Sequence, residues 1–141
     1  MEQFIPLKNE QDYIDFIHRT NYLHDGRIIS ADYKKSVTAK MNHIVQDMPD
    51  LTLKILVTSM KDYPVVEIHF GGVMDMRLHG GFSDIFQFDM KWGRTNNLLH
   101  EPYVQWCTEL HFDWENHSME TDPNTTYVIA RSAEWRFTEN P

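Results

Sequence analysis

The sequence predicts an α+β fold that is mostly β: a curved antiparallel meander or barrel-like sheet of about six to eight strands, with one N-terminal helix packed on it. Apolar residues recur clearly at helical spacing in one segment, between residues 10 and 20. Most of the remaining chain alternates apolar with polar residues, which is the pattern of antiparallel strands that bury one face. Aromatic residues form 13% of the chain, enough side-chain volume for a single core.

The helix is predicted from Glu10 to Thr20. Asn9 can cap its first turn, and Asp12 stands three residues later, as in a weak capping box. An apolar stripe at i, i+3 and i+4 gives the helix one face to bury, and it consists of Tyr13, Phe16 and Ile17. A helix this short needs such packing to be stable. We therefore expect it to cover an open end or the apolar face of the sheet.

Seven segments show the two-residue alternation of strands. They are Leu23–Tyr33, Leu51–Val57, Val66–Phe70, Met74–Leu78, Phe86–Trp92, Tyr103–Glu115 and Thr125–Thr138. The pair Gly71-Gly72 permits a bend or a tight connection between the third and the fourth. Residues 34–48 suit either a short helix or a strand. The predicted core is aromatic and apolar: Phe86, Phe88, Trp92, Trp106, Leu110, Phe112 and Trp114.

Length and cysteine content place the protein in a broad class. The chain has 141 residues, which predicts one domain spanning residues 1–141. Its single cysteine, Cys107, cannot form an intramolecular disulfide, which is typical of a reducing compartment. The N-terminal residues do not resemble a secretory signal, and no stretch is long and apolar enough for a membrane span. We therefore expect a cytoplasmic protein.

The charge of the chain bears on its partners. The formal net charge is −8. A negative field repels phosphate backbones and anionic lipid surfaces, so we expect neither general nucleic-acid binding nor membrane binding. The same field attracts a basic protein partner. Many soluble proteins carry an acidic surface for solubility alone, so both interpretations stay open.

The dipeptide His24-Asp25 follows the predicted helix. A histidine beside a carboxylate can bind a metal or act as an oriented general base. In the metal-dependent phosphohydrolases known by this dipeptide, the pair lies in an all-helical bundle with further ligands. The structural alternative is that Asp25 forms a turn and His24 bonds to the backbone, which the turn preference of aspartate favours.

A second candidate site comes from the polar face of the sheet, because alternate residues of a strand project together. Glu67 and His69 share one face of their strand, and Glu109, His111 and Asp113 share one face of another. If those strands adjoin, His69, His111 and Asp113 could hold a divalent metal with an open position. The alternative is an ordinary solvated face. We therefore predict no cofactor for the chain in general. A divalent metal is expected only if His69, His111 and Asp113 form this site.

Three segments give the chain a resemblance to a known group: a helix leading into YLHDGRI, then EIHFGGV, then the aromatic-rich IFQFDMKW. The layout resembles a broad group of small uncharacterised bacterial proteins. Some members are encoded beside secreted toxins and look like their immunity proteins. Residue by residue, the resemblance covers His24, Asp25, Phe70 and Val73. It implies a protein-binding function and no particular chemistry for these four residues.

The leading hypothesis is therefore a non-enzymatic protein-binding module, immunity-like or antitoxin-like, that uses an acidic surface. Its candidate contacts include the acidic segment with Glu115, Glu120 and Asp122. One alternative is a metal-dependent enzyme or small-ligand binder with a His/carboxylate site on the sheet. Another is a structural subunit of a homo-oligomer such as a homodimer, because exposed sheet edges can pair.

Overall fold

A computed structural model describes residues 3–35, 37–40, 43–46, 49–78, 84–85, 88–94, 102–108 and 126–138. Its helices are α1 (Glu10–Arg19) and the short η1 (Asn21–Leu23). Its strands are β1 (Ile5–Pro6), β2 (Gly26–Lys34), β3 (Val37–Lys40), β4 (His43–Gln46), β5 (Asp50–Val57), β6 (Val65–Arg77), β7 (Asp84–Ile85), β8 (Asp89–Arg94), β9 (Pro102–Cys107) and β10 (Tyr127–Thr138).

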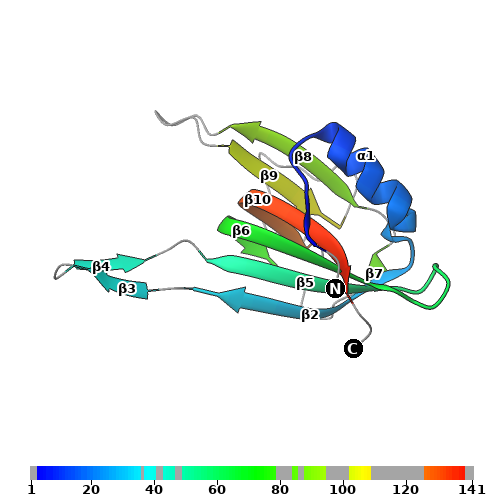
Figure 1. The fold of residues 1–141 in the computed structure, drawn as a ribbon, viewed down its shortest axis with the longest axis horizontal. Coiled ribbons are helices and arrows are strands. Elements are labelled where there is room, and N and C mark those ends of the chain that lie inside the picture. The colour runs from blue at the N-terminus through cyan, green and yellow to red at the C-terminus, as the bar shows by residue number, and fades with distance from the viewer. Residues whose placement is uncertain are drawn as a thin grey trace, which may run out of the picture.

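The main sheet is antiparallel and has the order β7-β2-β5-β6-β10-β9-β8, with β1 added to β10 (Figure 1). This confirms the predicted fold class of a curved, mostly β sheet with one N-terminal helix. The strand order departs from chain order where β7 pairs with β2, where β1 pairs with β10 and at β10 itself. The C-terminal strand β10 lies in the middle of the sheet, between β6 and β9, because it pairs with β6 along its whole length.

The sheet is strongly curled, and one short connection in the chain limits the distance between its two edges. β7 pairs with β2 at one end of the strand order, whereas β8 lies at the other end. Yet Ile85 and Asp89 are only four residues apart, so their Cα atoms are separated by at most about 14 Å. Among the described residues the hydrogen-bonded path does not close, but its two edges must approach one another.

The predicted helix is confirmed. The Asn9 side chain accepts a hydrogen bond from the Asp12 backbone N–H at 2.9 Å, as a capping residue should. Phe16 is fully buried, and its ring centroid lies 5.0 Å from that of Trp135 on β10. Tyr13 meets the aromatic rings of Phe88 and Trp92 at 5.8 and 6.0 Å. The apolar stripe therefore fastens α1 to the inner face of the sheet.

The predicted alternation of apolar and polar residues identifies many of the core residues. Every second residue of β5 is completely buried: Leu51, Leu53, Ile55 and Val57. Of the predicted core residues, Phe88 and Trp106 are buried and Trp92 packs against the core cluster. Phe86, Leu110, Phe112 and Trp114 lie outside the described residues or without a described side chain. Cys107 is also buried.

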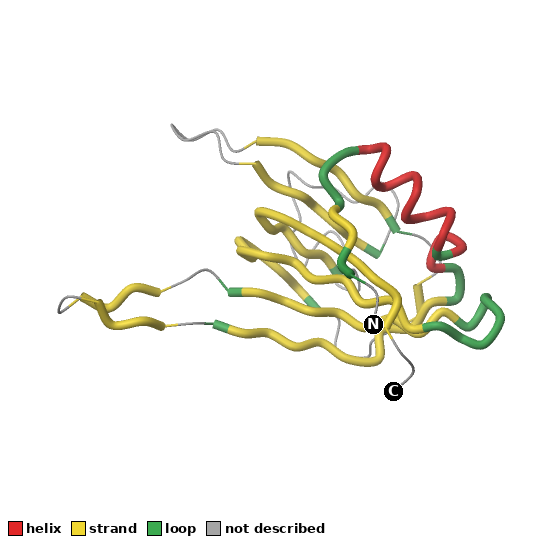
Figure 2. Tube along the Cα trace, in the orientation of Figure 1, coloured by secondary structure: helices red, strands yellow, loops and turns green. Residues whose placement is uncertain are grey.

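Several segments differ from the sequence-based expectation. The strand predicted at Phe86–Trp92 corresponds to β8, which begins at Asp89 and ends at Arg94. Val66–Phe70 and Met74–Leu78 belong to one strand, β6, which bends at Gly71-Gly72 instead of turning back. Gly72 has φ +62°, a backbone conformation that favours glycine, so the pair bends the strand without breaking its pairing to β10. Residues 34–48, which suited either a helix or a strand, contain the hairpin β3–β4, and it extends beyond the main sheet (Figures 1 and 2).

The first strand begins later than Leu23. Leu23 belongs to η1, and β2 begins at Gly26. In the described part of the chain, no helix has the length and hydropathy required to span a membrane.

Candidate functional site

The outer face of the sheet carries a polar network across β5, β6 and β10. His69 of β6 lies opposite Thr52 of β5 and Glu134 of β10. Its Nδ1 is 2.9 Å from Glu134 Oε1, and its Nε2 is 3.6 Å from Asp50 Oδ2. Asp50 in turn accepts a hydrogen bond from the Gly72 backbone N–H at 3.2 Å. The histidine is therefore held between two carboxylates from the neighbouring strands.

Two residues further along the same strands, Glu67 meets Arg136. The Arg136 Nε and Nη2 atoms donate to the two oxygens of the Glu67 carboxylate at 3.1 and 3.4 Å. The Arg136 guanidinium also lies over the Phe4 ring, 4.0 Å from its centroid. Phe4 contacts His69 as well, with ring centroids 5.9 Å apart. The N-terminal residue Phe4 therefore packs against both the Arg136 guanidinium and the His69 ring.

The structure thus places Glu67 and His69 on one face, as the alternation predicts. It brings them to Asp50, Glu134 and Arg136, and each contact is made between neighbouring strands. No group of three or more histidine, cysteine, aspartate or glutamate side chains suited to a metal occurs among the described residues. The remaining candidates lie outside the described residues: Glu109, His111, Asp113, Glu115, Glu120 and Asp122. The proposed metal set of His69, His111 and Asp113 therefore stays a prediction.

His24 and Asp25 lie in the connection from η1 to β2. The His24 Nε2 is 3.6 Å from the Asp25 carboxylate, and both side chains are more than half exposed. The His24 backbone N–H donates to the Asn21 carbonyl, and the Asp25 carbonyl accepts from the Thr58 hydroxyl. The pair thus has the turn geometry of the structural alternative, while its side chains stay open to solvent.

This turn is unusual in its backbone. Asn21, Tyr22 and Leu23 have φ of 52°, 59° and 49°, and Asp25 has φ of 56°. Left-handed conformations of residues with a β-carbon cost on the order of 1–2 kcal/mol each. Leu23 is completely buried and anchors the turn, whereas Tyr22 is 51% exposed. The chain can double back here because Gly26 packs against it: an added Cβ would lie 2.6 Å from the Leu23 carbonyl oxygen.

A second left-handed turn lies beside the first. It joins β5 to β6, and there Asp62 and Tyr63 have φ of 65° and 47°. Tyr63 is 62% exposed. The Asn21 side chain donates to the Ser59 hydroxyl at 3.1 Å, which links the two turns. Figure 2 shows both turns at the end of the sheet where α1 terminates. We call five of the exposed residues of these turns the tip surface: Tyr22, His24, Asp25, Asp62 and Tyr63. Lys61, which precedes Asp62, is exposed as well.

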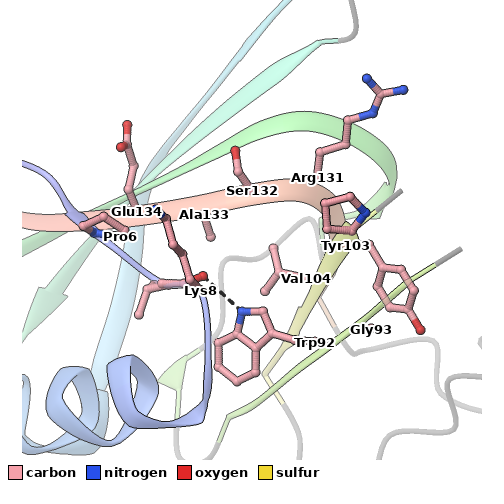
Figure 3. A pocket seen from close by; sticks show the side chains of 12 residues that line it. Pro6, Lys8, Trp92, Gly93, Tyr103, Val104, Arg131, Ser132, Ala133 and Glu134 are labelled. Atoms are coloured by element: carbon pink, nitrogen blue, oxygen red, sulfur yellow. Dashed lines mark hydrogen bonds between the residues drawn. The ribbon is translucent and has the colours of Figure 1, made fainter. Parts of the chain in front are cut away.

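A large pocket lies elsewhere, between β10, β9, β8 and the N-terminal segment at β1. It has a volume of about 800 Å³. Its apolar lining includes Leu7, Trp92, Val104 and Ala133, and its charged lining residues are Lys8, Arg131 and Glu134 (Figure 3). The Trp92 indole N–H donates to the Leu7 carbonyl at 3.0 Å, so the ring is fixed in place.

Two tyrosines have altered ionisation. Burial, with the charges of Asp89 and Cys107 as smaller causes, raises the pKa of Tyr13 to about 12. Burial also raises the pKa of Tyr127, whose hydroxyl donates to Asp75 at 3.2 Å. Both phenols therefore stay protonated at neutral pH and act as packing and hydrogen-bonding groups.

No family model, curated protein or solved structure matches the chain. The site must therefore be argued from geometry.

Sequence reasoning missed the two tyrosines of the tip surface. A signal for them was present, because Asn21 and Asp62 precede them and these residue types adopt left-handed turns readily. The pocket left no comparable local signal, since its lining comes from four separate segments.

Proposed function

We propose that the protein is a non-enzymatic binding module that engages a basic partner protein through the tip surface. One observation carries the proposal: Tyr22 and Tyr63 are exposed on left-handed turns that are linked to each other. Strained backbone of this kind persists only where the surrounding structure enforces it, and it clusters at functional sites. Tyrosine is also enriched among the residues that dominate binding energy in protein interfaces.

The chemistry of the tip surface favours a basic partner. Asp62 directly precedes Tyr63, and Asp25 follows Tyr22 by three residues. An aromatic ring attracts an arginine or lysine of the partner through its face, and a nearby carboxylate can accept its hydrogen bonds. The net charge of −8 adds long-range attraction and speeds the encounter. Neutralisation of a basic toxin, as the resemblance to immunity proteins implies, is one case of this function.

The test first identifies the partner by cross-linking it to a residue of the tip surface. A photoreactive phenylalanine analogue placed at position 63 is used to cross-link the protein in its source cell, and the captured protein is purified. The affinity of the purified pair is then measured by calorimetry for the native chain, Tyr22→Asn and Tyr63→Asn. Asparagine tolerates the left-handed backbone, so each variant removes the ring without adding strain. We expect a basic partner and a loss of at least about tenfold in affinity for each variant.

Tyr33→Asn is the matched control. Tyr33 is 48% exposed but lies on β2, away from both turns. Its replacement should leave the affinity unchanged. The proposal is wrong if no partner is captured, if the partner is acidic, or if the three variants bind it equally well.

A further inference from the structure

The pocket of about 800 Å³ arises where β10 changes partners. One edge of β10 pairs with β9 from Tyr127 to Ala130. Further along β10, this same edge pairs with β1 at Glu134 and Trp135. Between these stretches β9 diverges, and the Leu7 backbone N–H bonds to the Ala133 carbonyl at 2.9 Å. A slot is left between β9 and the N-terminal segment, and its size is that of a small-molecule site.

The walls of the slot are apolar and rigid. Leu7, Val104 and Ala133 are buried core residues, and Trp92 closes one side with its N–H already bonded. Tyr103 lies across Gly93 so closely that a Cβ added at Gly93 would be 2.6 Å from the Tyr103 Cζ. Figure 3 shows Tyr103 at one end of the slot and Glu134 at the other. An apolar ligand body would therefore lie against preformed surfaces while one side of the slot stays open to solvent.

The charged residues at the rim favour an anion. Lys8 and Arg131 line the slot together with a single acid, Glu134. Glu134 is bound by His69 at 2.9 Å, so its charge is directed toward the outer face of β6. In a chain with net charge −8, the exposed Lys8 provides a cation at this rim. Small-molecule sites commonly combine such an apolar body with a few polar groups that orient the ligand.

We infer that this slot is a second binding site, independent of the tip surface, for a small monocarboxylate with an apolar body. The body packs against Trp92, Val104 and Ala133, and the carboxylate meets Lys8 at the rim.

The test uses a dansylated medium-chain fatty acid as the probe, with fluorescence titration of the full chain. The primary amide of the same probe has the same body without the charge. Lys8→Gln removes the rim cation but keeps the backbone N–H of Lys8, which bonds to Asp12 at 2.8 Å. Lys91→Gln is the matched control, because Lys91 neighbours Trp92 in sequence, is exposed and does not line the slot.

We expect saturable binding of the acid and weaker binding of the amide. Lys8→Gln should weaken binding of the acid about fivefold, the effect of losing one exposed charge contact. Lys91→Gln should change it by less than about twofold. The inference is overturned by absent binding, by equal binding of the acid and the amide, or by equal effects of the two lysine variants. Tyr22→Asn should not alter probe binding, so this result is distinguishable from failure of the tip proposal.

Discussion

Tyr22 is the residue at which backbone strain and exposure coincide most clearly. It stands between Asn21 and Leu23 in a run of three left-handed residues. The strain is maintained by its surroundings: Leu23 is completely buried, and Asn21 is hydrogen-bonded to Ser59 on the neighbouring turn. A ring held outward in this way loses little conformational freedom on binding, which is one reason why preorganised aromatic residues contribute strongly to affinity.

Replacing Tyr22 with glycine should therefore stabilise the fold and weaken partner binding. Glycine adopts left-handed φ without steric cost, but it also has greater entropy in the unfolded chain. The net effect should raise the free energy of unfolding by roughly 0.5–1 kcal/mol. Urea unfolding measures the change. Tyr22→Ala separates the two effects, because alanine loses the ring but keeps the strain. Equal stability of the glycine and alanine variants would show that the turn stores no strain.

The Glu67–Arg136 pair is a second residue-scale feature with a measurable contribution. Both side chains are less than one-fifth exposed, and Phe4 covers the guanidinium. Glu67→Gln leaves the arginine partly buried without a charged partner, which should cost about 1–2 kcal/mol in urea unfolding. Asp32→Asn, in the exposed Asp32–Lys34 pair, should cost less than about 0.5 kcal/mol. A similar small cost for both variants would contradict the role of burial.

At the scale of elements, the bend shared by β6 and β10 decides the shape of the molecule. Ile68, Phe70 and Val73 of β6 all point into the core, although Phe70 and Val73 are three residues apart. The two glycines between Phe70 and Val73 both take outward positions. Their partners on β10, Arg131 and Ser132, are both exposed in the same way. The two strands therefore shift phase together at the bend, and next to it their pairing register shifts between Ile129 and Ala130. The shift occurs where β9 leaves β10, next to the slot.

The bend predicts a rescue experiment. Gly71→Ala should cost about 1–2 kcal/mol, because the new Cβ would lie 2.6 Å from the Ser132 Oγ. Adding Ser132→Ala removes that oxygen and should restore most of the loss, as measured by thermal unfolding. Gly72→Ala should not be rescued in this way, because its φ of +62° penalises any side chain. Failure of the Gly71 rescue would place the strain elsewhere.

At the scale of the whole molecule, α1 is joined to the curled sheet by aromatic contacts. Tyr13 lies between Phe88 and Trp92, and Trp92 also forms a wall of the slot. Helix packing, sheet curvature and the slot therefore depend on one another.

This packing predicts a pH dependence of stability. Burial raises the pKa of folded Tyr13 to about 12 from the ordinary tyrosine value of 10.0, so the folded state keeps a proton that the unfolded chain loses first. The contribution is fully present below pH 10.0, and it is lost as the pH rises from there to about 12. Tyr13→Phe should reduce the steepness of this alkaline loss, measured by urea unfolding between the two pKa values. Parallel slopes for the two proteins would contradict this prediction.

Local patterns predicted the elements well, because helix capping and alternation depend on residues close together in sequence. Asn9, the stripe that begins at Tyr13 and the buried positions of β5 could all be predicted. The bend at Gly71-Gly72 was one of two options that the glycines allowed. The pairing of His69 with Asp50 and Glu134 could not be predicted, because the partners are separated from it by 19 and 65 residues.

The sequence by itself determined where the helix lies, which face of β5 is buried and what net charge the chain carries. Only the tertiary structure decided that β10 lies beside β6, that two left-handed turns meet at one end of the sheet and that a slot opens beside β9. The physical reason is that periodicity is a property of neighbouring residues. Strand order and register, in contrast, result from loop closure and packing between segments far apart in the chain.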